Sequence, residues 1–223
     1  NQLNDNHVVP ILSGGTGLYV QSLLENYNFN DIKPNTKLRI ELDELYTEYG
    51  VDGLREYAQN LAEKGGIEIK YTDKHRLYRA IELMTAGDYK SLIKQTKEGL
   101  SYKGPVIGLQ RERSDLYDRI NRRVEIMFEK GLVDEVKQLL KNGVNPNCQA
   151  FKGIGYKEVV QYLEGLISYD ACVDLIQKNT RHFAKRQITW YKRMPYIEWI
   201  TIDSQTTEAE IYGMACNIID SSF

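Results

Sequence analysis

The sequence predicts an α/β protein whose parallel sheet is interrupted by a long helical insertion. Two apolar runs next to glycine or proline, residues 106–109 and 196–202, have the length and composition of sheet strands. A third run, residues 8–12, is followed by glycines and then by an amphipathic stretch from Leu18. The order strand, glycine turn, helix is typical of an α/β sheet, so a strand is expected at residues 8–12 as well.

The helical insertion is predicted by a change of periodicity between these runs. Three stretches repeat apolar residues every three or four positions, the pattern of helices buried on one face. Their apolar positions are Leu38, Leu42 and Leu45, then Leu54, Tyr57 and Leu61, then Leu77, Ala80, Ile81 and Met84. Asn35, Asp52 and Asp73 precede them as caps. The chain is therefore divided into an α/β core, residues 1–30 and 104–223, and a helical insertion, residues 31–103.

Further helices are expected in the second half of the core. Ser114 can cap a helix that Gly131 closes, and another helix follows it. Residues 168–194 read as one long helix stopped by Pro195, and a last helix is expected from Thr207.

Composition restricts the classes of protein to which the chain can belong. Its 223 residues hold 29 Lys and Arg against 31 Asp and Glu, so the net charge of −2 provides no global field that would hold a polyanion. Cys148, Cys172 and Cys216 are too widely spaced for a disulfide framework or a zinc site. No apolar run spans a membrane and no signal peptide opens the chain, which predicts a cytoplasmic protein without a membrane partner.

The clearest local charge feature is a segment in the predicted long helix. Between Leu175 and Ile197 there is no acidic residue, and aromatic residues lie among the basic ones, which are Lys178, Arg181, Lys185, Arg186, Lys192 and Arg193. Cations interleaved with aromatic rings are typical of a surface that binds nucleic-acid phosphates. The alternative is an exposed basic face whose apolar residues pack on the core.

Two shorter segments contain glycines that let the backbone approach a ligand. In residues 14–19, GGTGLY, Thr16 offers a hydroxyl at a helix start, although a tight turn with a capping threonine explains the same residues. In residues 150–158, AFKGIGYKE, amides and lysines can face phosphate while Tyr156 stacks on a base; a loop with a buried tyrosine is the alternative.

Two arginine clusters complete the candidates. Arg76 and Arg79 share a helix face, where they can grip phosphates or pair with Glu82. Arg119 and Arg123 are four residues apart on another helix, where their repulsion would be relieved by an anion such as a diphosphate or by neighbouring acids.

Taken in order, five segments of this sequence resemble the tRNA dimethylallyltransferase family: GGTGLY, HRLYRAIE at residues 75–82, the arginine helix, KGIGYKEV at residues 152–159 and KRQITWYKR at residues 185–193. The resemblance implies transfer of a dimethylallyl group from dimethylallyl diphosphate to the exocyclic amine of the adenosine 3′ of the tRNA anticodon, assisted by Mg²⁺. It also implies a core like that of P-loop kinases and an insertion that contacts the anticodon arm. A monomer is expected.

The resemblance also assigns residues. Thr16 and Arg123 match catalytic positions, and together with Gly15 they match those that bind the diphosphate. No residue matches a metal ligand. The positions that match tRNA contacts are Thr16, Lys37, Arg76, Arg79, Lys152, Gly153, Ile154, Gly155, Tyr156, Lys157, Arg181, Lys185, Arg186, Gln187, Trp190 and Lys192.

The sequence departs from the family pattern in two respects. Residues 70–73 read Lys-Tyr-Thr-Asp where relatives usually carry a His-Pro-Asn-Asp-like stretch. The family's phosphate loop, Gly-x-x-x-x-Gly-Lys-Ser/Thr, and the aspartate that acts as general base do not occur in these 223 residues. The chain alone is therefore expected to be inactive, either as a fragment of a longer enzyme or as a relative that binds tRNA without catalysis. Prenylation of free adenine nucleotides is a further alternative, and so is a P-loop nucleotide kinase.

Overall fold

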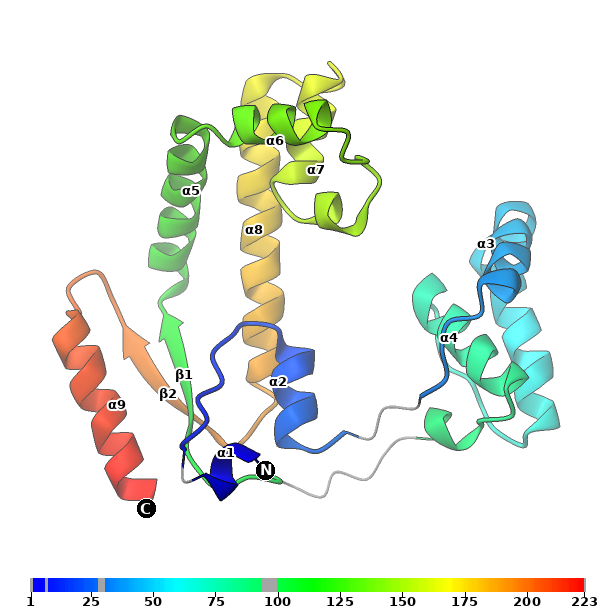
Figure 1. Ribbon diagram of the computed structural model, residues 1–223, viewed down its shortest axis with the longest axis horizontal. Coiled ribbons are helices and arrows are strands. Elements are labelled where there is room, and N and C mark those ends of the chain that lie inside the picture. Colours follow the sequence, from blue (N-terminus) through cyan, green and yellow to red (C-terminus); the bar gives the residue numbers. More distant parts are fainter. Residues whose placement is uncertain (1, 7, 28–30, 94–99, 223) are drawn as a thin grey trace. The chain divides into compact units, whose positions relative to one another are not determined.

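The computed structural model describes residues 2–6, 8–27, 31–93 and 100–222. Contacts divide the chain into two compact units, residues 1–20 with 102–223 and residues 21–101, and the division falls inside α2. The boundaries expected from the sequence lie near residues 30 and 104. In chain order the elements are α1 (Gln2–Asp5), α2 (Gly17–Leu24), α3 (Thr36–Lys64), α4 (Lys74–Thr85), η1 (Lys90–Leu92), β1 (Val106–Arg111), α5 (Arg113–Glu129), α6 (Leu132–Lys141), η2 (Gln149–Lys152), α7 (Tyr156–Leu163), α8 (Tyr169–Tyr191), β2 (Ile197–Ile202) and α9 (Glu208–Ser222) (Figure 1).

The first unit contains a small parallel sheet, so the predicted α/β class is confirmed. β1 pairs with β2 in register from Val106 opposite Ile197 to Arg111 opposite Ile202, and α9 packs on β2. Gly108 permits this pairing, because a Cβ atom there would lie 2.7 Å from Cγ2 of Ile197. The two strands expected at residues 106–109 and 196–202 are therefore present.

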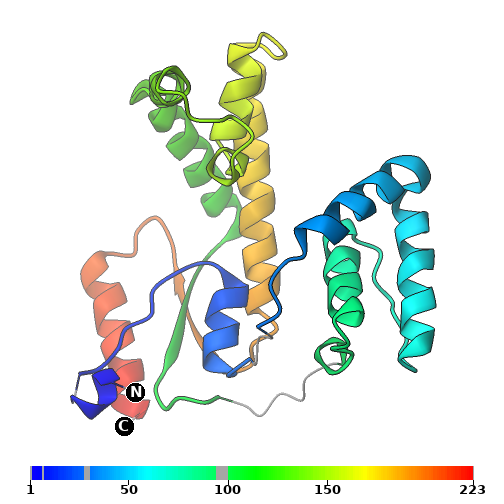
Figure 2. The same cartoon turned by 45° about the vertical axis from the view of Figure 1, so that its right-hand side comes forward.

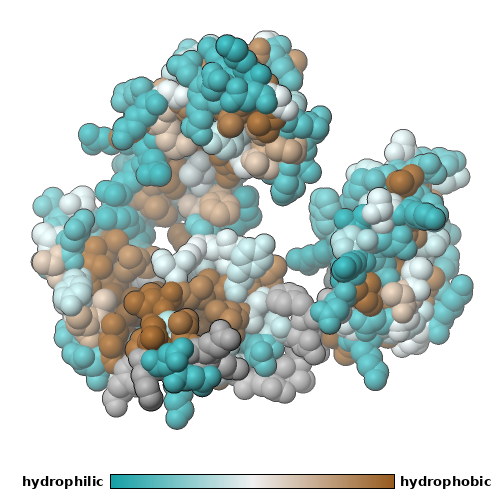
Figure 3. Space-filling model, viewed as in Figure 1, coloured by the Kyte–Doolittle hydropathy of each residue, from teal (hydrophilic) through white to brown (hydrophobic). Residues whose placement is uncertain are grey.

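The strand expected at residues 8–12 is absent, and that prediction was wrong. These residues form no strand, and Val9 and Ile11 are 80% and 90% exposed. An extended segment becomes a strand only when a neighbour accepts and donates its backbone hydrogen bonds. In the described part of the chain β1 and β2 pair with each other, and no strand pairs with residues 8–12. Figure 3 shows hydrophobic residues gathered on the part of the first unit that carries this segment.

The helical part of the first unit has its own core. α5 and α8 pack side by side, and α7 packs against α8 (Figures 1 and 2). The buried side chains of this core are Val124, Phe128, Leu132, Val136, Phe151, Val159, Cys172 and Ile176. The long helix expected at residues 168–194 is α8, and Ser168 caps it by accepting a hydrogen bond from the Ala171 amide. α5, however, is capped by the Glu112 carboxylate and not by Ser114, because the helix begins two residues earlier than predicted.

The second unit is formed by α3 and α4, which bury one continuous apolar cluster that includes Leu42, Leu54, Leu77 and Ile81. Asn35 caps α3 and Asp73 caps α4, both as expected. The first two predicted helices are continuous in α3, which is kinked at Gly50, where φ is 65° and ψ is −156°. Tyr57 was expected in the core but is 40% exposed, because the buried stripe of the second half of α3 runs through Leu54, Ala58 and Ala62, and Tyr57 lies beside it.

None of the helices formed by the described residues is long and apolar enough to cross a bilayer.

Candidate functional site

The glycine turn lies against the C-terminal half of α8, far away in sequence. The Gln187 side chain donates a hydrogen bond from Nε2 to the carbonyl oxygen of Gly15 at 2.8 Å. At Gly17 a Cβ atom would lie 2.3 Å from Cδ1 of the Trp190 ring, so only glycine allows this approach. Thr16 stands exposed between these two contacts, and its carbonyl oxygen accepts from the Tyr19 and Val20 amides at the start of α2. In Figures 1 and 2 α2 lies beside the lower end of α8.

The basic face of α8 borders this turn. His182, Lys185, Arg186, Thr189, Trp190 and Arg193 line an open pocket of about 480 Å³. Lys185 and Arg186 are exposed, and no acidic side chain of the described residues lies within ion-pair distance of either. Trp190 belongs to both features, because its ring lines the pocket and also backs Gly17. The turn and the basic face therefore share one helix and one side chain.

The other candidate cations on α8 differ in whether they can bind phosphate. Lys192 is exposed at the helix end, whereas Arg181 donates to the Asn121 side chain of α5 and helps to hold the two helices together. Trp190 Nε1 and the Tyr191 hydroxyl are buried and have no hydrogen-bond partner among the described residues. Burial raises the pKa of Tyr191. Of the two cations, Arg181 therefore stabilises the packing of α8 on α5, whereas Lys192 is exposed.

The loop at residues 152–157 is fixed by the buried carboxylate of Glu158. Glu158 is 4% exposed and accepts from the Gly155 amide at 2.8 Å and from Asn179 of α8 at 2.7 Å. Gly155 has a φ of 106°, which a side chain would strain. Lys152, Gly153, Ile154 and Lys157 are exposed on the surface of this loop.

Tyr156 is engaged within the protein. Its hydroxyl donates to Glu135 of α6, which raises the pKa of Tyr156, and its ring lies 5.6 Å from that of Phe151. The structure therefore fits the alternative of a loop with a packed tyrosine.

The arginines of α5 are exposed. Arg119, Arg122 and Arg123 have no ion pair within the described part of the chain. In the described part of the chain, neighbouring acids therefore do not pair with these arginines, and each guanidinium is available to an anion.

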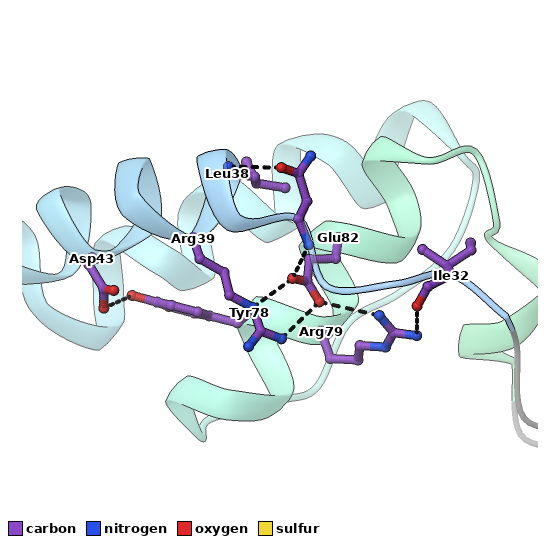
Figure 4. A network of polar contacts seen from close by, with 8 residues as sticks. Ile32, Leu38, Arg39, Asp43, Tyr78, Arg79 and Glu82 are labelled. Carbon is purple, nitrogen blue, oxygen red and sulfur yellow. Dashed lines mark hydrogen bonds and ion pairs between the residues drawn. The ribbon is translucent and has the colours of Figure 1, made fainter. Parts of the chain in front are cut away.

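In the second unit a buried carboxylate organises two arginines. The Glu82 side chain is fully buried and accepts from Arg39 Nε at 2.7 Å, from the Asn35 amide at 3.0 Å and from Arg79 Nη1 at 3.3 Å (Figure 4). Burial alone would raise the pKa of Glu82, but the hydrogen bonds from Arg39, Asn35 and Arg79 outweigh it and hold the pKa below its ordinary value.

Arg79 therefore differs from the other basic candidates of this unit. It also donates to the carbonyl oxygen of Ile32 at 2.8 Å, so it links the start of the unit to α4 (Figure 4). Pairing with Glu82, the alternative raised by the spacing, is confirmed for Arg79. Lys37 and Arg76 are exposed and have no ion pair among the described residues.

The burial of Glu82 and Glu158 was not expected from the sequence. Glu82 had been considered only as a possible surface partner, and Glu158 only as part of the loop. The sequence contained one signal, because Glu82 and Glu158 directly adjoin the apolar residues Ile81 and Val159 on their helices. An acid that is buried at such a position needs fixed hydrogen-bond donors.

Among the described residues no group of three or more His, Cys, Asp or Glu side chains could hold a metal ion. The carboxylates described above are each engaged by protein donors. These residues do not fit a resident metal, and no chemical step is assigned to one.

The geometry defines an α/β protein in which a glycine turn is held on a helix whose adjacent face carries unpaired cations. A comparison with family models matches residues 1–194 to the IPP transferase family. The chain belongs to this family, and the resemblance found in the sequence is confirmed.

Two relatives and two solved structures support this assignment. The chain is 37% identical to the tRNA dimethylallyltransferase of Clostridioides difficile (strain 630), with 91% of this chain and 66% of the relative aligned. It is 37% identical to that of Alkaliphilus metalliredigens (strain QYMF), with 94% and 68% aligned. The chain thus spans about two thirds of the length of these curated relatives.

The solved structures show the same fold. The tRNA isopentenylpyrophosphate transferase of Bacillus halodurans matches 99% of this chain with 70% of its own, at 32% identity and a TM-score of 0.62. The tRNA delta(2)-isopentenylpyrophosphate transferase of Staphylococcus epidermidis matches 99% with 72% of its own, at 32% identity and a TM-score of 0.63.

Proposed function

We propose that the protein carrying this chain is a tRNA dimethylallyltransferase that modifies the adenosine 3′ of the anticodon. The observation that carries the proposal is the free cationic face of α8 beside the glycine turn, in a chain of the IPP transferase family. A phosphate-binding face next to a turn that can approach a small anion suits an enzyme with one large and one small phosphorylated substrate. A P-loop-kinase-like core is part of this proposal.

In the reaction, the exocyclic nitrogen bonds to the allylic carbon, the bond from that carbon to the diphosphate oxygen breaks, and the nitrogen releases one of its two protons. A neutral aromatic amine is a weak nucleophile, so stabilising the departing negative charge lowers the barrier most. Arg123 supplies a cation for the diphosphate, and Thr16 with Gly15 lies at the start of α2, where the helix dipole favours an anion. No general base is assigned among these residues.

The tRNA is bound by exposed cations of both units. Lys185, Arg186, Lys192, Lys152 and Lys157 serve the first unit, and Lys37 and Arg76 serve the insertion, which contacts the anticodon arm. Phosphate contacts of this kind position the RNA without reading its sequence. Mg²⁺ belongs to the proposal as an ion held by diphosphate oxygens and water, a coordination this ion prefers.

The test is a transfer assay with the full-length protein. With Mg²⁺ and dimethylallyl diphosphate, an unmodified tRNA anticodon arm should gain the mass of one dimethylallyl group on that adenosine. A tRNA arm with guanosine at the position is the matched control and should stay unmodified. Absence of transfer to the adenosine arm would contradict the proposal.

Free adenine nucleotide is the competing acceptor. The unpaired cations of α8 exceed what a single nucleotide needs, which favours tRNA. AMP in excess over tRNA should therefore leave tRNA prenylation unchanged, and strong competition by AMP would reverse this assignment.

The affinity of the basic face of α8 for tRNA should depend on salt concentration in a specific way. Replacing Lys185 and Arg186 together by Ala should weaken tRNA binding and reduce the slope of log affinity against log salt by about one unit for each phosphate that these side chains no longer neutralise. Filter binding or fluorescence anisotropy over a salt series measures both quantities. The matched control replaces Lys137 and Lys141 of α6, which removes the same charge elsewhere. Equal slopes for the two double variants would place the RNA away from α8.

A further inference from the structure

The residue before Thr16 receives a hydrogen bond from a side chain that is far away in sequence. Gln187 Nε2 donates to the Gly15 carbonyl oxygen at 2.8 Å, across a separation of 172 residues. In the described part of the chain, residues 8–16 belong to no helix or strand, so regular structure does not fix the turn before α2 begins. The Gln187 amide and the Trp190 ring are the groups that define where the turn lies.

The same two groups connect the turn to the basic pocket. Trp190 lines the pocket with Lys185 and Arg186 and also fills the space that a side chain at Gly17 would need. Gln187 directly follows Arg186 in the helix. A helix turn is rigid over such a distance, so the pocket cations and the turn keep a constant separation.

We propose that Gln187 is a positioning residue for the transfer step: it holds the Gly15 carbonyl on α8 and thereby places Thr16 at a constant distance from the phosphate-binding face. This inference rests on the proposed prenyl transfer and assigns to Gln187 a role other than direct contact with tRNA. Displacement of a reacting group by about 1 Å can cost on the order of a hundredfold in rate, so removal of the tether acts on turnover and not on RNA affinity.

The first experiment uses the full-length protein and does not require activity. Gln187→Met keeps the length of the side chain and removes the donor. Amide hydrogen exchange at Tyr19 and Val20, whose N–H groups donate to the Thr16 carbonyl oxygen, should become roughly fivefold faster once the turn is released, while exchange in α5 and α7 stays unchanged. Gln187→Lys, which restores an N–H donor, should recover part of the protection. Unchanged exchange at Tyr19 and Val20 in Gln187→Met would overturn the proposal.

The second experiment measures transfer by the full-length protein. Gln187→Met should lower kcat by about tenfold or more and leave the KM for tRNA unchanged. Gln177→Met is the matched control, because Gln177 lies on the same helix and donates from Nε2 to the Asn121 carbonyl oxygen of α5 at 3.3 Å, away from the turn. It should retain the wild-type kcat.

The outcomes separate the two proposals. A raised KM for tRNA with normal kcat in Gln187→Met would make Gln187 an RNA contact and overturn the positioning role. A wild-type protein that transfers no prenyl group would instead reject the proposed function, and the exchange experiment would still decide whether Gln187 holds the turn.

Discussion

Glu82→Gln is expected to destabilise the second unit by about 3 kcal/mol, since removing the charge of a buried carboxylate leaves its cationic partners without compensation. The Glu82 side chain has no exposed surface, and it receives hydrogen bonds from Arg39, Arg79 and the Asn35 amide. These donors come from the start of α3 and from α4. The carboxylate therefore links the two helices, and the donors compensate its negative charge (Figure 4).

Hydrogen exchange of α3 and α4 amides across a urea series measures this destabilisation. Trp190 and Trp199 both lie in the first unit, so tryptophan fluorescence in the same series should not change. Glu68→Gln is the control, because Glu68 and Lys70 form an ion pair with both side chains more than 75% exposed. Its effect should stay within about 0.5 kcal/mol.

The stabilisation of the second unit by Glu82 should also depend on pH. Its folded-state pKa lies below the ordinary value of 4.5, so its contribution to stability is fully present above that value and is lost as the pH falls through the folded pKa. The stability difference between wild type and Glu82→Gln should therefore be constant near neutral pH and shrink below about pH 4.5. A difference that stays constant into strong acid would show that the charge of Glu82 is not the source of the stabilisation.

Arg123→Ala is expected to lower turnover of the full-length protein by about a hundredfold while leaving tRNA affinity unchanged. A fixed donor that stabilises developing negative charge typically contributes this much to the rate. Arg123 is exposed on α5 and has no ion pair among the described residues, so its truncation leaves no buried group unpaired. The fall should therefore come from the diphosphate step and not from unfolding.

Arg122→Ala provides the matched control, because Arg122 is the adjacent residue, equally exposed and equally charged. Single-turnover kinetics with bound tRNA separate chemistry from RNA binding. Near-normal turnover in Arg123→Ala, or an equal fall in Arg122→Ala, would remove the specific role assigned to Arg123.

Local features of the fold could be predicted from the sequence because they depend on neighbouring residues. Asn35, Asp73 and Ser168 cap helices by bonding to amides three positions ahead, and such contacts follow from sequence spacing alone. The prediction of a strand at residues 8–12 was wrong because a strand needs a hydrogen-bonding partner, which no local pattern reveals. The Tyr57 prediction failed because the buried stripe of the second half of α3 continues from Leu54 to Ala58 and Ala62, and spacing alone did not distinguish Tyr57 from the adjacent Ala58.

The candidate site shows the same distinction. The pattern of residues 176–196 identified a concentration of cations, but it could not show that Lys185 and Arg186 are unpaired while Arg181 bonds to Asn121. For Arg79, spacing suggested Glu82 as a partner, but the participation of Arg39, 43 residues from Glu82, was not apparent.

By itself the sequence determined the α/β class, the position of most helices and the family to which the segments correspond, since periodicity and motif order are written along the chain. Only the tertiary structure decided which charges remain free and which are buried, and that the Gly15 turn is held by Gln187. The physical reason is that a side chain's partner is chosen by proximity in space, and the chain brings residues 172 positions apart within 2.8 Å only after the helices have packed.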